Sequence, residues 1–60
     1  MINSTDKQEF EAYLVTLSDY QVYHCYHREN DAGQHDGAED RLEYAALAQI
    51  EAEKRNINLD

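Results

Sequence analysis

Apolar residues recur at helical spacing over the first half of the chain. The positions that share this spacing are Phe10, Tyr13, Leu14, Leu17 and Tyr20. Intervals of three and four residues place such side chains on one face of an α-helix. Thr5 and Gln8 fit a capping box, in which a hydroxyl and a side-chain amide exchange hydrogen bonds with the backbone of the first turn. The pattern predicts a helix over about 5–29.

A strand is the competing interpretation of one part of this segment. The stretch from Tyr20 to Tyr26 is rich in residues that favour β-structure. However, no turn residue separates it from the helical pattern before it, and a single short strand would have no partner to pair with. We therefore favour the helical interpretation.

Turn residues interrupt the pattern in the middle of the chain. Both glycines lie here beside Asn and Asp, and Gly33 can take the left-handed conformation that closes a helix. This predicts a loop over about 30–36. Asp36 then fits as an N-cap with Glu39 three residues on, which predicts a second helix over about 37–55 and a frayed tail after it.

Two helices joined by a short polar loop fold back antiparallel. The sequence thus predicts one all-α domain, a two-helix hairpin covering residues 1–60. A chain of this size buries only about 60% of the surface that its unfolded form exposes, so it usually needs a disulfide, a metal or an oligomer. Cys25 is the one cysteine, so no intrachain disulfide can form.

The first predicted helix carries more apolar surface than one packing partner can cover. Val15, Val22, Cys25 and Tyr26 lie on a face beside the first one, whereas a helix with a single partner needs a stripe of about 100°. We expect the surplus to be buried in a homodimer with a four-helix arrangement. The residues expected in the core or the dimer interface are Phe10, Tyr13, Leu14, Leu17, Val22, Leu42, Ala46 and Ile50.

Small residues form a separate face on the second predicted helix. They are Ala45, Ala48 and Ala52. Helix propensity alone accounts for them, and this is the interpretation we favour. The alternative is that they allow another helix to approach closely.

The charge of the chain excludes several kinds of partner. Thirteen carboxylates stand against five lysines and arginines, which gives a formal net charge of −8. Such a surface repels nucleic-acid phosphates and anionic membranes. The longest apolar runs are far below the ~20 residues that span a bilayer, the start of the chain does not resemble a signal peptide, and a lone cysteine fits a reducing compartment. We expect a cytoplasmic protein that binds neither nucleic acid nor membrane directly.

Histidines and the cysteine are the candidate metal ligands. The four residues concerned are His24, Cys25, His27 and His35. Imidazole and thiolate bind zinc, but zinc sites normally use paired ligands, and this chain has no second cysteine. We therefore expect no metal and no cofactor, and we keep a metal-stapled helical domain as an alternative.

Catalytic motifs are absent from the sequence, and residues typical of interfaces are frequent. It contains no Ser-His-Asp spacing, no phosphate-binding glycine loop and no HExxH motif, so we expect a non-enzymatic protein. Five tyrosines are many for 60 residues, and tyrosine is enriched at protein interfaces. The candidates for partner contact are Tyr20, Tyr23, Tyr26, Glu39, Asp40 and Glu43.

The chain also resembles a group of known proteins in its general character. The residues that carry the resemblance are the polar start at 1–6, the tyrosine- and histidine-rich segment 20–27, and the Ala/Glu-rich helix that ends at 53–56. In these features it resembles the small acidic early-region proteins of lambdoid bacteriophages, encoded between the exonuclease and excisionase genes. The resemblance implies a non-enzymatic regulator of host or phage proteins in the bacterial cytoplasm.

Two function classes follow from these observations. The favoured one is a homodimeric module that binds an unidentified protein partner. The alternative is an acidic nucleic-acid mimic, whose carboxylates at Glu39, Asp40 and Glu43 would occupy the groove of a DNA-binding protein.

Overall fold

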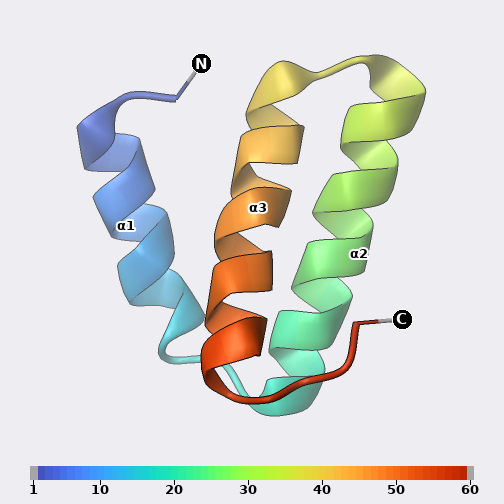
Figure 1. The fold of residues 1–60 in the computed structure, drawn as a ribbon. Coiled ribbons are helices and arrows are strands. Elements are labelled where there is room, and N and C mark those ends of the chain that lie inside the picture. The colour runs from blue at the N-terminus through green and yellow to red at the C-terminus, as the bar shows by residue number, and fades with distance from the viewer. Residues whose placement is uncertain (1, 60) are drawn as a thin grey trace.

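Three α-helices make up the fold. The computed structural model describes residues 2–59 and places α1 at Ser4–Leu14, α2 at Asp19–Asp36 and α3 at Glu39–Lys54. Within this part of the chain there is no strand, so the prediction of an all-α protein is confirmed. α2 and α3 form an antiparallel hairpin, and α1 lies on the other side of α3 (Figure 1). The fold is therefore a hairpin with a third helix beside it.

The expected single helix over 5–29 is wrong, because the chain breaks between α1 and α2. Ser18 is the N-cap of α2: its Oγ accepts a hydrogen bond from the Gln21 backbone N–H at 3.2 Å, and the Gln21 side chain accepts one from the Ser18 N–H at 2.9 Å. This reciprocal pair is a capping box, which starts a new helix. The Thr16 hydroxyl donates to the Tyr13 carbonyl at 2.6 Å where α1 ends. The apolar spacing continues across the break, so it does not reveal that one helix ends and another begins.

The first helix also begins earlier than expected. Its N-cap is Asn3, whose side-chain oxygen accepts a hydrogen bond from the Asp6 N–H at 2.7 Å. Thr5 lies within the first turn, so the expected capping box of Thr5 and Gln8 is wrong. Asparagine is as good an N-cap as serine or aspartate, and here it occupies the position two residues before the threonine.

The expected loop over 30–36 is helical. α2 continues to Asp36, and the connection to α3 is only Gly37 and Ala38. Gly37 has a φ of 66° and closes α2 in the left-handed conformation. Ala38 takes the N-cap position of α3 with no side-chain hydrogen bond, so Asp36 does not cap that helix. The expected helix over about 37–55 corresponds to α3.

Gly33 serves close packing and not a turn. It is buried inside α2, and a Cβ added to it would lie 2.7 Å from both Cγ and Cδ2 of Leu42 on α3. It would also lie 3.1 Å from the Leu42 backbone N. A side chain at this position would therefore displace the Leu42 side chain and crowd its backbone.

The interface between α2 and α3 is built from small residues on one side. Ala45, Ala48 and Ala52 of α3 are 3%, 0% and 0% exposed. Val22 and Cys25 of α2 are buried as well. The interpretation of the alanines as helix formers alone is wrong, because their small side chains also lie at a closely packed interface.

The main core cluster joins all three helices. It contains Leu14 of α1, Cys25 of α2, and Leu47 and Ala48 of α3. The partly buried apolar residues that pack against it are Ile2, Phe10, Leu17, Tyr26 and Tyr44. Because α3 lies in the middle (Figure 1), its two sides supply the core contacts for both neighbours.

One ion pair fastens α2 to the start of α3. Glu29 is 4% exposed, and the Arg41 guanidinium donates to its two carboxylate oxygens at 2.9 and 3.1 Å. A buried carboxylate needs such a partner, since an unpaired charge away from water is costly. The hydrogen bond and the charge of Glu29 also raise the pKa of Arg41 above its usual value, so this arginine stays positively charged.

A second arginine closes the connection between α1 and α2. The Arg55 guanidinium donates to the carbonyl oxygens of Leu17 at 2.8 Å and Leu14 at 3.1 Å. It also pairs with Glu51 at 2.8 Å and Asp19 at 3.1 Å. These bonds involve the carbonyl of Leu14 at the end of α1, which has no helical partner within α1, and the carbonyl of Leu17 in the connection.

The segment after α3 makes hydrogen bonds to α3 and, at Leu59, to His27 of α2. Asn56 has a φ of 59°, the Ile57 N–H donates to the Ala52 carbonyl at 2.9 Å, and the Asn56 N–H donates to the Glu53 carbonyl. This pair of bonds is a Schellman motif, with asparagine in the place that glycine usually takes. The described residues after α3 are non-helical and are held by these hydrogen bonds, and Asp60 lies outside the described residues.

Candidate functional site

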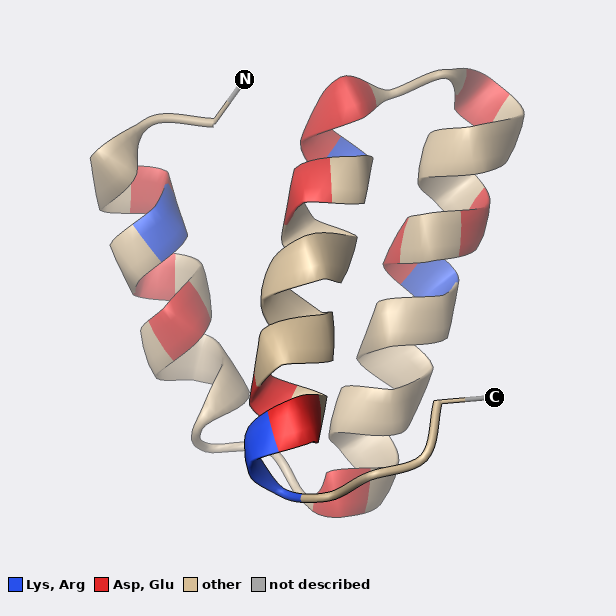
Figure 2. Cartoon of the chain, in the orientation of Figure 1, with Lys and Arg blue, Asp and Glu red and all other residues tan. Residues whose placement is uncertain are grey.

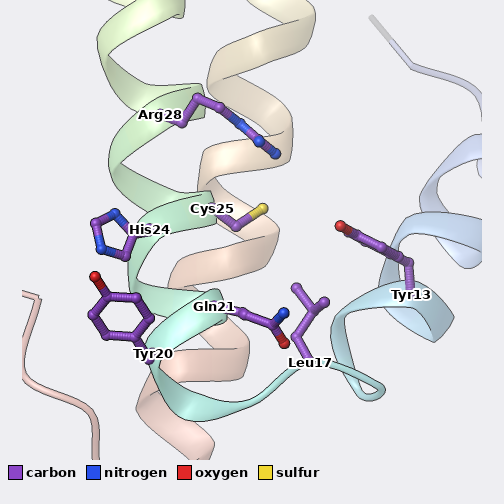
Figure 3. A pocket seen from close by; sticks show the side chains of 7 residues that line it. All are labelled: Tyr13, Leu17, Tyr20, Gln21, His24, Cys25 and Arg28. Atoms are coloured by element: carbon purple, nitrogen blue, oxygen red, sulfur yellow. The ribbon is translucent and has the colours of Figure 1, made fainter.

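A groove lies between the end of α1 and the first half of α2. It has a volume of about 260 Å³. Its lining residues are Tyr13, Leu17, Tyr20, Gln21, His24, Cys25 and Arg28. Figure 3 shows Tyr13 on α1 facing α2 across the groove, with Leu17 at its end. The groove exists because α1 and α2 both pack on α3.

The chemistry of this groove differs from that of the rest of the surface. None of its seven lining residues is acidic, although the chain has thirteen carboxylates. Arg28 supplies a positive charge at one end, and Tyr20, with 72% of its surface exposed, forms part of the rim. Tyrosine and arginine are enriched among residues that dominate binding energy in protein interfaces. The groove therefore has the composition of a protein-binding surface.

Cys25 is part of the groove lining but is only 4% exposed. Burial raises the pKa of this thiol above its ordinary value, and the nearby Arg28 only partly opposes that shift. The thiol is therefore protonated at neutral pH. Because the thiolate is the form that attacks electrophiles and binds metals, this environment favours a packing role for Cys25.

The four candidate metal ligands are not brought together. Among residues 2–59, no group of three or more His, Cys, Asp and Glu side chains has a geometry that could hold a metal ion. The His24 ring lies edge-on to Tyr20, with centroids 4.4 Å apart. The His27 Nε2 is 2.8 Å from the Leu59 carbonyl oxygen. His35 is exposed in the last turn of α2.

The three tyrosines proposed for partner contact differ in exposure. Tyr20 is largely exposed, whereas Tyr23 and Tyr26 are half-buried. Tyr26 packs against the core cluster, and the rings of Tyr23 and Tyr26 lie 4.6 and 5.1 Å from that of His27. Tyr20 is the one of the three that offers most of its surface to a partner.

The acidic candidates lie in the first turns of α3 and have separate roles. Figure 2 shows acidic positions at this end of the helix. Glu39 and Asp40 are exposed, where the positive end of the helix dipole favours them. The Glu43 carboxylate accepts a hydrogen bond from the Ile2 N–H at 2.6 Å and is half-buried. Glu43 thus helps to hold the beginning of the chain on α3.

The residues expected in the core or dimer interface fall into three groups. Leu14 and Val22 are buried, and Phe10 and Leu17 are half-buried. The other four are exposed and lie outside the monomer core: Tyr13, Leu42, Ala46 and Ile50. The sequence pattern did not identify the core residues Leu47 and Glu29. Leu47 lies beside the apolar face that the helical spacing selects, and Glu29 is not an apolar residue.

Leu42, Ala46 and Ile50 form a row along α3, which we call the α3 row. They are four residues apart, so their side chains lie on one face of the helix. Leu42 and Ile50 are 40% and 50% exposed. Val15, which is 64% exposed, lines a surface pocket together with Ile50 and so extends the row toward α1. An apolar row on the central helix is a second candidate contact surface.

Comparison with known proteins adds no family to this description. No family model, no curated protein and no solved structure matches the chain. Between residues 2 and 59, no helix is both long and apolar enough to cross a bilayer.

Proposed function

We propose that this chain is a small non-enzymatic interaction module that forms a homodimer and binds a partner protein. The observation that carries the proposal is the single layer of helices (Figure 1), with overall dimensions of 27 × 26 × 14 Å. Protein domains normally bury their core between two packed layers. Here the large apolar side chains of Tyr13, Val15, Tyr20, Leu42 and Ile50 are 40–72% exposed. A second chain is the natural source of the missing layer.

The α3 row is the surface that we assign to the homodimer. In a two-fold symmetric interface the same patch contacts itself. If two α3 helices cross antiparallel at Ala46, Leu42 meets Ile50 of the partner subunit, and the small Ala46 side chain lets the helices approach. This arrangement would cover the most exposed apolar residues of the central helix.

The groove between α1 and α2 is the surface that we assign to the partner protein. Its tyrosine, leucine and arginine lining and its lack of carboxylates support this assignment. The resemblance to early proteins of lambdoid phages supports a host or phage protein as the partner and the bacterial cytoplasm as the setting. The identity of the partner is left to the experiment.

The dimer is tested by placing a charge on the α3 row. We expect light scattering to give about twice the chain mass for the wild type at micromolar concentration. Ile50→Glu should give a monomer, because a carboxylate would be buried against apolar side chains. Gln8→Glu adds the same charge at an exposed position on α1 and should remain a dimer. A monomeric wild type, with a melting temperature that does not depend on concentration, would refute the dimer.

Partner binding is tested by affinity capture from bacterial lysate with quantitative mass spectrometry. We expect Tyr20→Ala to reduce capture of specific partners about tenfold or more, because Tyr20 offers most of its surface to a partner and tyrosine is enriched among residues that dominate binding energy. The matched comparison is Glu39→Gln with Asp40→Asn, which neutralises exposed acids at the other end of the hairpin. If this charge variant loses the partners and Tyr20→Ala keeps them, the protein acts as an acidic mimic.

A further inference from the structure

An open pocket next to the groove combines aromatic rings with carboxylates. It has a volume of about 240 Å³. The five residues that line it are Asp6, Glu9, Phe10, Tyr13 and Tyr44. Every one of them is either aromatic or acidic. Tyr13 also lines the groove between α1 and α2, so the two depressions are neighbours on the surface.

The helix geometry explains why these residues meet. The four on α1 are spaced at intervals of three and four residues, so they share one face of that helix. Tyr44 reaches the pocket from α3. Phe10 and Tyr44 are partly buried and pack against the core cluster, which fixes the positions of their rings. Tyr13 is 49% exposed and forms the outer wall.

The three rings lie close together and are tilted relative to one another. The centroids of Phe10 and Tyr44 are 4.5 Å apart with an interplanar angle of 48°. The centroids of Phe10 and Tyr13 are 6.1 Å apart at 41°. The face of an aromatic ring carries negative electrostatic potential and attracts an ammonium or guanidinium group within about 6 Å of its centroid.

The carboxylates add formal negative charge to the same place. Among the described residues, neither Asp6 nor Glu9 forms an ion pair with a lysine or arginine. Burial, followed by the charges of Asp6 and Asp40, raises the pKa of Tyr44 above its usual value. The hydroxyl of Tyr44 is therefore neutral at physiological pH, and the electrostatic potential around it is negative.

We propose that this pocket binds an organic cation, an ammonium or guanidinium group. The three rings and two carboxylates supply the two features that attract such a cation, aromatic π-systems and opposite charge. The net charge of −8 attracts cations toward the protein. A lysine or arginine side chain of a basic partner is one source, and a free quaternary ammonium compound is the other. The first source rests on the proposed interaction function, whereas the pocket itself does not.

The test is an NMR titration that observes the ring resonances of Phe10, Tyr13 and Tyr44. Three probes are compared: choline, its uncharged isostere in which carbon replaces the quaternary nitrogen, and lysine capped at both backbone ends. We expect choline or capped lysine to shift the three rings in a saturable way. The uncharged isostere should bind at least about fivefold more weakly, since it lacks the cation–π and ionic attraction.

Variants locate the binding to the pocket. Tyr13→Leu and Glu9→Gln should each raise the dissociation constant about two- to fivefold. The matched controls are Glu53→Gln and Asp31→Asn, which also remove a carboxylate charge but at exposed positions of α3 and α2 away from the pocket. These should leave the dissociation constant unchanged.

Each outcome of the titration either identifies the source of the cation or overturns the proposal. Binding of capped lysine supports a protein side chain as the ligand, and binding of choline alone supports a free quaternary ammonium compound. The proposal is overturned if neither cation shifts the rings, if the isostere binds as tightly as choline, or if the control variants weaken binding as much as the pocket variants. Because the probes are small molecules, the result of this titration does not depend on whether the protein is a dimer or on whether a partner protein is captured.

Discussion

Replacing Leu14 with alanine should leave little folded protein at room temperature. Leu14 is 1% exposed and belongs to the cluster in which the three helices meet. Removing a buried leucine side chain costs about 2–5 kcal/mol, because apolar contacts are lost and a cavity remains. A core of this size rarely provides more than about 3–5 kcal/mol. We therefore expect a circular dichroism signal close to that of an unfolded chain, or a melting temperature lowered by tens of degrees.

The neighbouring residue provides the matched control. Val15 is 64% exposed, so at low protein concentration, where self-association does not contribute, Val15→Ala should change the free energy of unfolding by no more than about 0.5 kcal/mol. Both variants shorten an apolar side chain at the end of α1, and only their burial differs strongly. If Leu14→Ala melted within a degree or two of the wild type, the core would have to lie elsewhere.

Enlarging Ala48 to leucine should destabilise the protein by about 1–3 kcal/mol. Ala48 is 0% exposed and lies in the same core cluster as Cys25 and Leu47. Additional methyl and methylene groups at a closely packed interface force side chains off their rotamers and move the backbone. Alanine and leucine have nearly the same helix propensity, so a loss of this size would report packing. Urea denaturation followed by circular dichroism measures it.

Ala46→Leu is the corresponding control on the same helix. Ala46 is exposed, so the larger side chain meets solvent in the monomer and should change stability little. Measurements at low protein concentration keep any effect on self-association separate. Equal stability of the two variants would mean that the buried alanines serve helix propensity alone, as the sequence first suggested.

Local sequence signals predicted the helical class of the fold but not the number of helices. The apolar spacing around Leu14 and Leu17 is helical on both sides of the break, so the period alone cannot show that the chain changes direction there. The decisive signal is the pair Ser18 and Gln21, which is a capping box inside a segment that otherwise continues the pattern. The spacing of Thr5 and Gln8 also predicts a capping box, but the N-cap of α1 is Asn3.

Tertiary packing decided the features that the sequence could not predict. Gly33 looks like a turn residue because glycine favours turns, but its role depends on Leu42, which approaches from another helix. Likewise, helix propensity alone can explain the buried alanines of α3 until their neighbours in the fold are known. Both cases concern contacts between residues distant in sequence, which a local pattern does not contain.

The sequence predicted which residue types form the candidate surfaces but not where these surfaces lie in the fold. The tyrosines and the lack of catalytic motifs indicated an interaction protein, and Tyr20 is exposed as that role requires. The groove itself depends on α1 being a separate helix, so a hairpin prediction could not locate it. The pocket around Tyr44 was missed for the same reason, because it joins α1 to α3.

The central position of α3 has a consequence for the order in which the chain can be built. A ribosome makes α1 and α2 before α3, so both emerge before the helix on which they pack. Helix α1 has 11 residues, and isolated helices shorter than about 12–15 residues are marginal in water. Leu14 and Val22, almost fully covered in the finished molecule, are therefore exposed to solvent and to chaperones until α3 has been synthesised.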